Sequence, residues 1–141
     1  MLGFPGETAD DFKKLEAFVQ EQKFARLGAF CYSPEAGTRA ADFPNQVPRK
    51  LAQARYERIM EIQNEVSLAA NRSLKGKELK ILVDSVKGSR GTGRTELDAP
   101  GIDNGVILKK CPKGLTAGSF IQACVTEAKA YDITAEYIGK A

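Results

Sequence analysis

The spacing of apolar residues changes once along this 141-residue chain, and that change limits the possible folds more than any other feature. Up to about residue 74 apolar side chains recur at helical spacing, as at Phe12, Leu15 and Val19. From Leu79 onward they alternate with polar residues, which is typical of strands with one buried face. The sequence therefore predicts two unlike parts, joined by a long helix over residues 49–73.

The first part, residues 1–48, has the pattern of a turn, a helix and a strand. Thr8 with Asp11 three residues later is typical of a capping box, which predicts a helix over about 9–22. The apolar run at 27–32 predicts a short buried parallel strand. One helix and one strand cannot close a core, so we expect this part to be an α/β fragment of something larger.

The second part, residues 74–141, contains four or five short segments of period two, separated by turns. This spacing predicts a small antiparallel β-barrel or sandwich, of which an OB-like barrel is one form. The glycine-rich stretch 87–92 could suggest a phosphate-binding loop, but such a loop needs a helix after it. Strand-like sequence follows instead, so we expect a flexible hairpin.

The chain has no histidine, and its cysteines, Cys31, Cys111 and Cys124, are far apart. Histidine-dependent nucleophile systems, zinc sites and disulfide frameworks are therefore not expected. We expect Cys111 and Cys124 to be small strand residues rather than reactive thiolates. No apolar run is long enough for a membrane span, and residues 1–6 do not resemble a secretory signal. We therefore expect a cytoplasmic protein without a membrane partner.

The net charge of +3 falls entirely on residues 75–141, which hold eleven Lys or Arg and eight Asp or Glu. Five basic residues of this part are candidates for contacts with RNA phosphates: Arg90, Arg94, Lys109, Lys110 and Lys113. Aromatic residues for base stacking are not interleaved with them, which favours an ordinary solvated surface.

Three segments resemble the radical S-adenosylmethionine methylthiotransferases, in the order in which that family carries them. These are Gly3–Thr8 (G-F-P-G-E-T), Tyr32–Ala40 (Y-S-P-E-A-G-T-R-A) and Gly93–Thr95 (G-R-T) among alternating strands. The resemblance covers nearly all 141 residues. It implies the C-terminal portion of a radical-SAM partial TIM barrel in residues 1–48, the connecting helix 49–73 and a TRAM β-barrel domain in residues 74–141.

Two segments resemble the branch that adds a methylthio group to an aspartate of a small-subunit ribosomal protein. They are Y-S-P-E at Tyr32–Glu35 and the stretch G-R-T-E-L-D-A-P-G-I-D at Gly93–Asp103. The resemblance implies that this part completes the barrel and recognises the substrate. Two alternatives stay open: a tRNA methylthiotransferase, or a nonenzymatic TRAM-type RNA-binding module.

The resemblance also implies cofactors and site residues. The parent enzyme would use S-adenosylmethionine and two 4Fe–4S clusters, with Tyr32 and Ser33 at the S-adenosylmethionine pocket. The three cysteines match none of the family's cluster ligands, so we expect this chain alone to be inactive. Substrate contacts are expected at Glu35, Arg94, Asp98 and Asp103, because acidic groups suit a basic ribosomal protein. RNA is the other possible partner.

Overall fold

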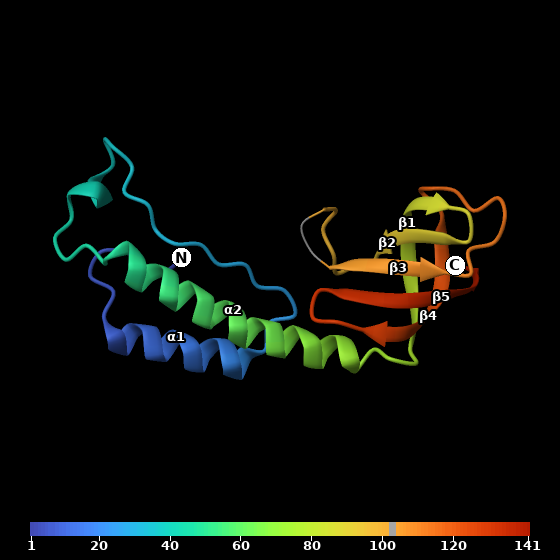
Figure 1. Ribbon diagram of the computed structural model, residues 1–141, viewed down its shortest axis with the longest axis horizontal. Helices are drawn as coiled ribbons and strands as arrows, with labels where there is room; N and C mark the ends of the chain where they lie inside the picture. Colours follow the sequence, from blue (N-terminus) through green and yellow to red (C-terminus); the bar gives the residue numbers. More distant parts are fainter. Residues whose placement is uncertain (102–103) are drawn as a thin grey trace. The chain divides into compact units, whose positions relative to one another are not determined.

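The computed structural model describes residues 1–101 and 104–141 (Figure 1). The chain divides into two compact units, Met1–Val66 and Ser67–Ala141, and the longest helix contributes residues to both. The elements are α1 (Ala9–Gln22), η1 (Arg39–Asp42), α2 (Arg49–Arg72), β1 (Glu78–Lys87), β2 (Arg90–Arg94), β3 (Gly105–Lys109), β4 (Phe120–Ala128) and β5 (Asp132–Lys140). Among the described residues, no helix combines the length and the apolar character that crossing a bilayer requires.

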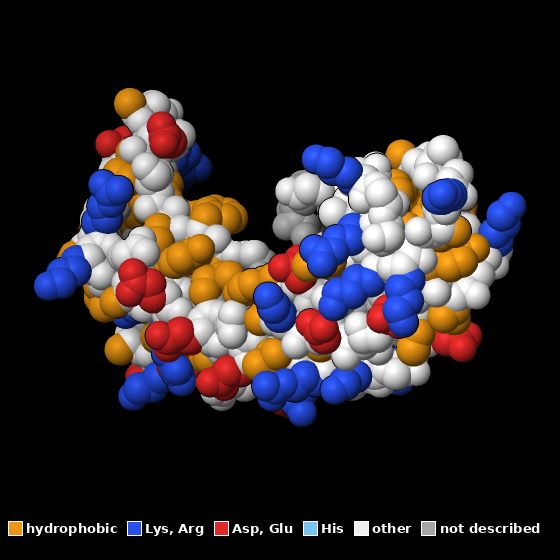
Figure 2. Space-filling model, turned by 45° about the vertical axis from the view of Figure 1, so that its right-hand side comes forward, with side chains coloured by type: hydrophobic (Ala, Val, Ile, Leu, Met, Phe, Trp, Pro, Cys, Tyr) orange, Lys and Arg blue, Asp and Glu red, His pale blue; other side chains and the backbone are white. Residues whose placement is uncertain are grey.

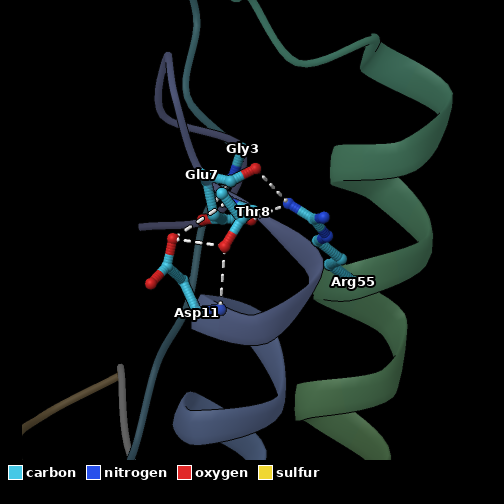
Figure 3. Close-up of polar contacts among 5 residues, drawn as sticks. All are labelled: Gly3, Glu7, Thr8, Asp11 and Arg55. Carbon is cyan, nitrogen blue, oxygen red and sulfur yellow. Dashed lines mark hydrogen bonds and ion pairs between the residues drawn. The ribbon is translucent and has the colours of Figure 1, made fainter.

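The capping box predicted at the start of α1 is confirmed (Figure 3). The Asp11 amide donates to Thr8 Oγ1 at 3.1 Å, and the Thr8 amide donates to Asp11 Oδ2 at 3.0 Å. The Thr8 hydrogen bonds lower the pKa of the Asp11 carboxyl, which keeps the negative charge at the positive end of the helix. Asp11 is therefore a helix-start residue, as the sequence predicts.

The strand predicted at 27–32 is wrong in extent. Only a single parallel bridge joins Leu2 to Cys31, where the Leu2 amide donates to the Phe30 carbonyl at 2.9 Å and the Tyr32 amide to the Leu2 carbonyl at 2.7 Å. A β-ladder needs a neighbouring strand with several residues to pair with. Among the described residues only Leu2 pairs with this segment. The Leu2–α1–Cys31 order is nevertheless that of a parallel crossover.

The buried face of α2 is more polar than the apolar spacing predicts. Ala52 and Ile59 are buried as expected, but Arg55, Gln63 and Asn71 are buried with them. These three polar residues follow one another at intervals of eight, which is about two and a quarter helical turns. Each donates a hydrogen bond to a main-chain carbonyl outside the helix, and so fixes a loop.

The carbonyls are far apart in sequence. Arg55 Nη1 donates to the Glu7 carbonyl at 3.2 Å, and Gln63 Nε2 to that of Phe24 at 2.9 Å. Asn71 Nδ2 donates to the carbonyls of Lys129 at 2.8 Å and Ala130 at 3.1 Å. Arg55 also forms an ion pair with the Glu7 side chain, whose Oε2 accepts from the Gly3 amide at 2.9 Å (Figure 3).

The second unit is a closed five-stranded barrel with the strand order β1-β2-β3-β5-β4, in which β4 returns to β1. All pairs are antiparallel except β3 with β5, which is parallel. The predicted small barrel is confirmed, and the expectation that it is wholly antiparallel is wrong. The β3–β5 pair is non-local, and period-two patterning does not report strand direction. This strand order is that of an OB-like barrel.

The barrel core consists of the side chains predicted to face inward. Ile81, Val83, Ile121, Ala123 and Val125 are all at most 1% exposed. Strand β2 has no such large side chains, because its inward positions are glycines. A Cβ atom at Gly93 would lie 2.6 Å from the Leu82 carbonyl oxygen and from Ile81 Cγ2. The glycine-rich stretch is therefore a strand–turn–strand hairpin that passes close to β1.

Candidate functional site

A groove of about 320 Å³ on the barrel, here called the barrel groove, brings together two residues that the sequence nominates for substrate binding. These are Arg94 from the end of β2 and Asp98 from the segment after it. The lining residues are Lys80, Leu82, Arg94, Thr95, Glu96, Asp98 and Phe120. Sequence reasoning missed Lys80 and Phe120, because only the pairing of β1 with β4 brings them to this face.

Strand register explains the groove. Leu82 pairs with Arg94 on one side and with Phe120 on the other, so the three side chains lie in one row across the sheet. Phe120 is 52% exposed, and the Lys80 ammonium lies 4.8 Å from the centre of its ring. Arg94 forms an ion pair with Asp84, which reduces its capacity for a second anion. The floor is therefore apolar and its rim carries both signs of charge.

Asp98 is buried, with 8% of its surface exposed. Its Oδ2 accepts hydrogen bonds from Thr95 Oγ1 at 2.5 Å and from the Thr95 amide at 3.4 Å. Thr95 Oγ1 in turn accepts from the Leu97 amide at 3.2 Å. Asp98 therefore shapes the turn that forms one wall of the groove. A direct contact between Asp98 and a substrate stays a prediction.

Three of the five candidate basic residues are paired with acidic side chains, while Arg90 and Lys113 have no ion pair with any described residue. Lys109 forms an ion pair with Glu127 at 3.0 Å and Lys110 with Glu136 at 2.7 Å, while Arg94 is paired as described. The pKa of Glu127 is lowered, chiefly by its hydrogen bond and charge interaction with Lys109. Figure 2 shows acidic side chains interspersed among the basic ones over the barrel. This arrangement is typical of a solvated surface.

A second groove, here called the Tyr32 groove, lies wholly within the first unit and measures about 680 Å³. Tyr32 and Ser33, the two residues nominated for S-adenosylmethionine, both line it, with Cys31, Pro34, Ala41, Gln46, Val47, Arg49, Ala52 and Gln53. The Tyr32 ring packs edge-on against Phe4 with 5.2 Å between ring centres. The Tyr32 hydroxyl is buried and has no hydrogen-bond partner among the described residues.

The remaining nominated residues lie elsewhere. Glu35 is an exposed residue of the first unit, and its carbonyl accepts from the Thr38 amide at 3.1 Å and hydroxyl at 2.8 Å. Glu35 and Asp98, both expected to contact a basic substrate, therefore belong to two different units. Asp103 lies outside the described residues. Glu35 lines neither of the two grooves.

The residues of this chain do not fit an iron–sulfur cluster. Cys31, Cys111 and Cys124 are free cysteines in separate elements, and the described residues contain no group of three potential metal ligands. Burial raises the pKa of the Cys111 thiol, so this cysteine stays protonated and packed. A cluster needs several thiolates close together.

Comparisons with known proteins agree with the barrel architecture and extend the likeness to the first unit. The family described as the TRAM domain matches residues 76–138. Three relatives carry the name "Ribosomal protein uS12 methylthiotransferase RimO". The one from Thermoanaerobacter sp. (strain X514) is 42% identical over 137 residues, the one from Carboxydothermus hydrogenoformans 44% over 142, and the one from Bacteroides thetaiotaomicron 38% over 141.

These alignments cover 97%, 98% and 99% of this chain, but only 31%, 32% and 32% of the respective relatives. The chain thus spans about a third of the length of the curated relatives that it matches. Both units fall within the matched region, so the likeness is not confined to the barrel. The chain matches the C-terminal part of the proteins named RimO, and the match includes the TRAM domain.

Proposed function

We propose that the chain is the C-terminal part of a methylthiotransferase that modifies an aspartate of ribosomal protein uS12. In this proposal the first unit completes a radical-SAM partial TIM barrel, and the TRAM barrel recognises the protein substrate. The observation that carries the proposal is the 38–44% identity, over nearly the whole chain, to relatives that carry this activity in their names. Such an enzyme would work in the cytoplasm, where ribosomes are assembled.

Substrate recognition is assigned to the barrel groove. Its exposed Phe120 offers an apolar anchor, and Glu96 on the rim offers a carboxylate to a basic ribosomal protein. The RNA-binding alternatives are less well supported, because Arg94, Lys109 and Lys110 are already paired with acidic side chains. Glu35 and Asp103 are kept as further proposed substrate contacts.

S-adenosylmethionine is assigned to the Tyr32 groove. The groove is large enough for a ligand of this size, and Tyr32 and Ser33 both line it. When bound, S-adenosylmethionine supplies the methyl-transfer and radical chemistry of the family. Tyr32 and Ser33 would bind and orient it. The two iron–sulfur clusters do not fit this chain, which is therefore proposed to be inactive alone.

A binding comparison tests the proposal. At physiological salt the chain is expected to bind purified uS12 more tightly than tRNA, since weak contacts to phosphates fade as salt rises. Phe120→Ala should weaken binding of uS12 by about tenfold or more, as expected for the loss of an interface anchor. Ile107→Ala is the matched control, because Ile107 is an exposed β-strand residue, 41% accessible, that does not line the groove.

Two outcomes would overturn the assignment of the barrel groove. In one, tRNA binds more tightly than uS12 at this salt and depends on Phe120, which would favour the RNA-binding module. In the other, both alanine variants bind uS12 as the parent chain does, so that recognition lies elsewhere.

A further inference from the structure

The barrel groove contains an aromatic ring that already holds a cation of the chain itself. The Lys80 ammonium lies 4.8 Å from the centre of the Phe120 ring, which is within the range of a cation–π contact. Strand pairing places both residues on one face of the sheet, because Phe120 of β4 pairs with Leu82, two residues after Lys80 on β1. Phe120 is nevertheless 52% exposed, so its ring stays accessible to a ligand.

The ring contact is the only interaction that holds Lys80 in the groove among the described residues. Its side chain is exposed and forms no ion pair or hydrogen bond with any of them. A cation–π contact at an exposed site is weak, and a free ammonium is strongly hydrated. Water therefore compensates Lys80 when another cation replaces it on the ring. Lys80 marks the position of a cation that a ligand can take over at small cost.

The charges around the groove favour a cation over an anion. Glu96 and Asp98 line it, and Asp84 borders it through an ion pair with Arg94. These three carboxylates face two basic side chains, Arg94 and Lys80. Asp84 is engaged by Arg94, and Asp98 by the turn that it shapes. Glu96 is exposed and forms no ion pair with any described residue, so it is the carboxylate that remains for a ligand.

We propose that the barrel groove binds an arginine side chain of a basic protein segment, which replaces Lys80 on the Phe120 ring and pairs with Glu96. A guanidinium is planar and more weakly hydrated than an ammonium, so it stacks on an aromatic face while its N–H groups still donate to a carboxylate. A volume of about 320 Å³ is at the small end of ligand pockets and suits a single side chain. This inference rests on the proposed function and deepens it, because it names the side chain that the substrate presents.

The first test is a titration of the 141-residue chain at constant ionic strength with three capped tripeptides, whose central residue is arginine, citrulline or glutamate between two glycines. Binding is followed through the Phe120 ring resonances and the backbone amides of residues 80–82 and 94–98. Citrulline has the shape of arginine without its charge, so the arginine peptide is expected to bind at least about fivefold more tightly. Equal binding of these two peptides, tighter binding of the glutamate peptide, or no binding of any of them would overturn the proposal.

Variants of exposed residues test each contact without unfolding the barrel. Phe120→Leu keeps an apolar side chain but removes the ring, and should weaken binding of the arginine peptide by about two- to fivefold, as should Glu96→Gln. Lys80→Gln should instead strengthen binding by about twofold or more, because it removes the competing cation. Lys87→Gln is the matched control, since it removes an equal charge from the same strand but outside the groove. Equal gains in both lysine variants, or no gain in Lys80→Gln, would overturn the proposal.

Purified uS12 separates this proposal from the assignment of the groove to that protein. Binding of uS12 that Phe120→Ala weakens and Phe120→Leu preserves would support the groove as the uS12 site with a purely apolar anchor, and would overturn the arginine proposal. Binding of the arginine peptide with the expected variant effects, without any binding of uS12, would support the arginine site and overturn its assignment to uS12. Weakening of uS12 binding by both Phe120 variants, with a gain from Lys80→Gln, would support both.

Discussion

The barrel unit and the first unit differ in the size of their buried apolar cores, which contain ten residues in the barrel and four in the first unit. The five strands of the barrel close on themselves, so that core side chains such as Ile81 and Ile121 are fully buried. In the first unit the only bridge among the described residues joins Leu2 to Cys31, and large side chains such as Phe30 remain exposed, at 64%. A closed sheet satisfies its own edges, whereas an open α/β unit leaves backbone groups and apolar surface uncovered.

The first unit compensates with buried polar contacts rather than with a large apolar core. Its buried apolar cluster contains Leu2, Val19, Ile59 and Ile62. Alongside it, the Glu7–Arg55 ion pair ties the N-terminal turn to α2, with side chains that are 13% and 7% exposed. Closure of the sheet stabilises the barrel unit, whereas a few specific polar contacts stabilise the first unit.

Amide hydrogen exchange should show the largest difference between the units. Core amides of β1, β4 and β5 are expected to exchange at least about a thousandfold more slowly than amides of residues 1–48, because they open only when the barrel unfolds. A dilute monomer measured by mass spectrometry or NMR provides the comparison. Strong and uniform protection across residues 1–48 under those conditions would contradict it.

The Glu7–Arg55 ion pair should dominate the stability of the first unit. Arg55→Met removes one partner and leaves a mostly buried carboxylate, which should destabilise this unit by about 3–5 kcal/mol. Arg58→Met is the control: Arg58 pairs with Glu16 at 2.9 Å, but its side chain is 49% exposed, so the cost should be at most about 1 kcal/mol. Loss of helical circular dichroism on heating measures both. Equal effects would mean that burial of the pair does not matter.

Local patterns were sufficient to predict the parts of this fold that are held by local contacts. The capping box at Thr8 and the inward faces of β1 and β4 depend on neighbours a few residues away, and these predictions are confirmed. The strand expected at 27–32 depends on a partner ladder, and a single bridge to Leu2 is all that forms. Arg55 is buried beside Glu7, which lies 48 residues away in sequence, so no local pattern marks it as a buried residue.

In the barrel groove, too, local sequence patterns could predict only the residues that lie close together in the chain. Arg94 and Asp98 lie close together in sequence, so a motif could nominate both. Lys80 and Phe120 come from strands that are neighbours only after β1 pairs with β4, and no sequence signal marks them. Burial of Asp98 against Thr95 could be suspected from the T-x-x-D spacing, which resembles a capping box.

Close packing of β2 against β1 is the next feature to test. Gly93→Ala places a Cβ atom 2.6 Å from the Leu82 carbonyl oxygen, so the barrel should lose about 1–3 kcal/mol through overpacking. Gly139→Ala is the control on β5, where an added Cβ atom meets nothing within 4 Å, and should be close to neutral. Urea unfolding followed by tyrosine fluorescence reports both. A neutral Gly93→Ala would show that β2 can move away from β1 at little cost.

The smallest expected effect is a pH-dependent one on the barrel surface. Lys109 lowers the pKa of the Glu127 carboxyl, so this group contributes stability at neutral pH that is lost as the pH falls through the lowered pKa. Glu127→Gln should therefore slightly destabilise the barrel at about pH 7, and this effect should disappear as the pH falls below the lowered pKa, because the carboxyl is then protonated in both states. Salt should shrink the difference, since the pair is exposed. In a Lys109→Met background Glu127→Gln should lose its effect at neutral pH. If Glu127→Gln still destabilised the barrel in the Lys109→Met background, the stabilisation by Glu127 would come from a neighbour other than Lys109.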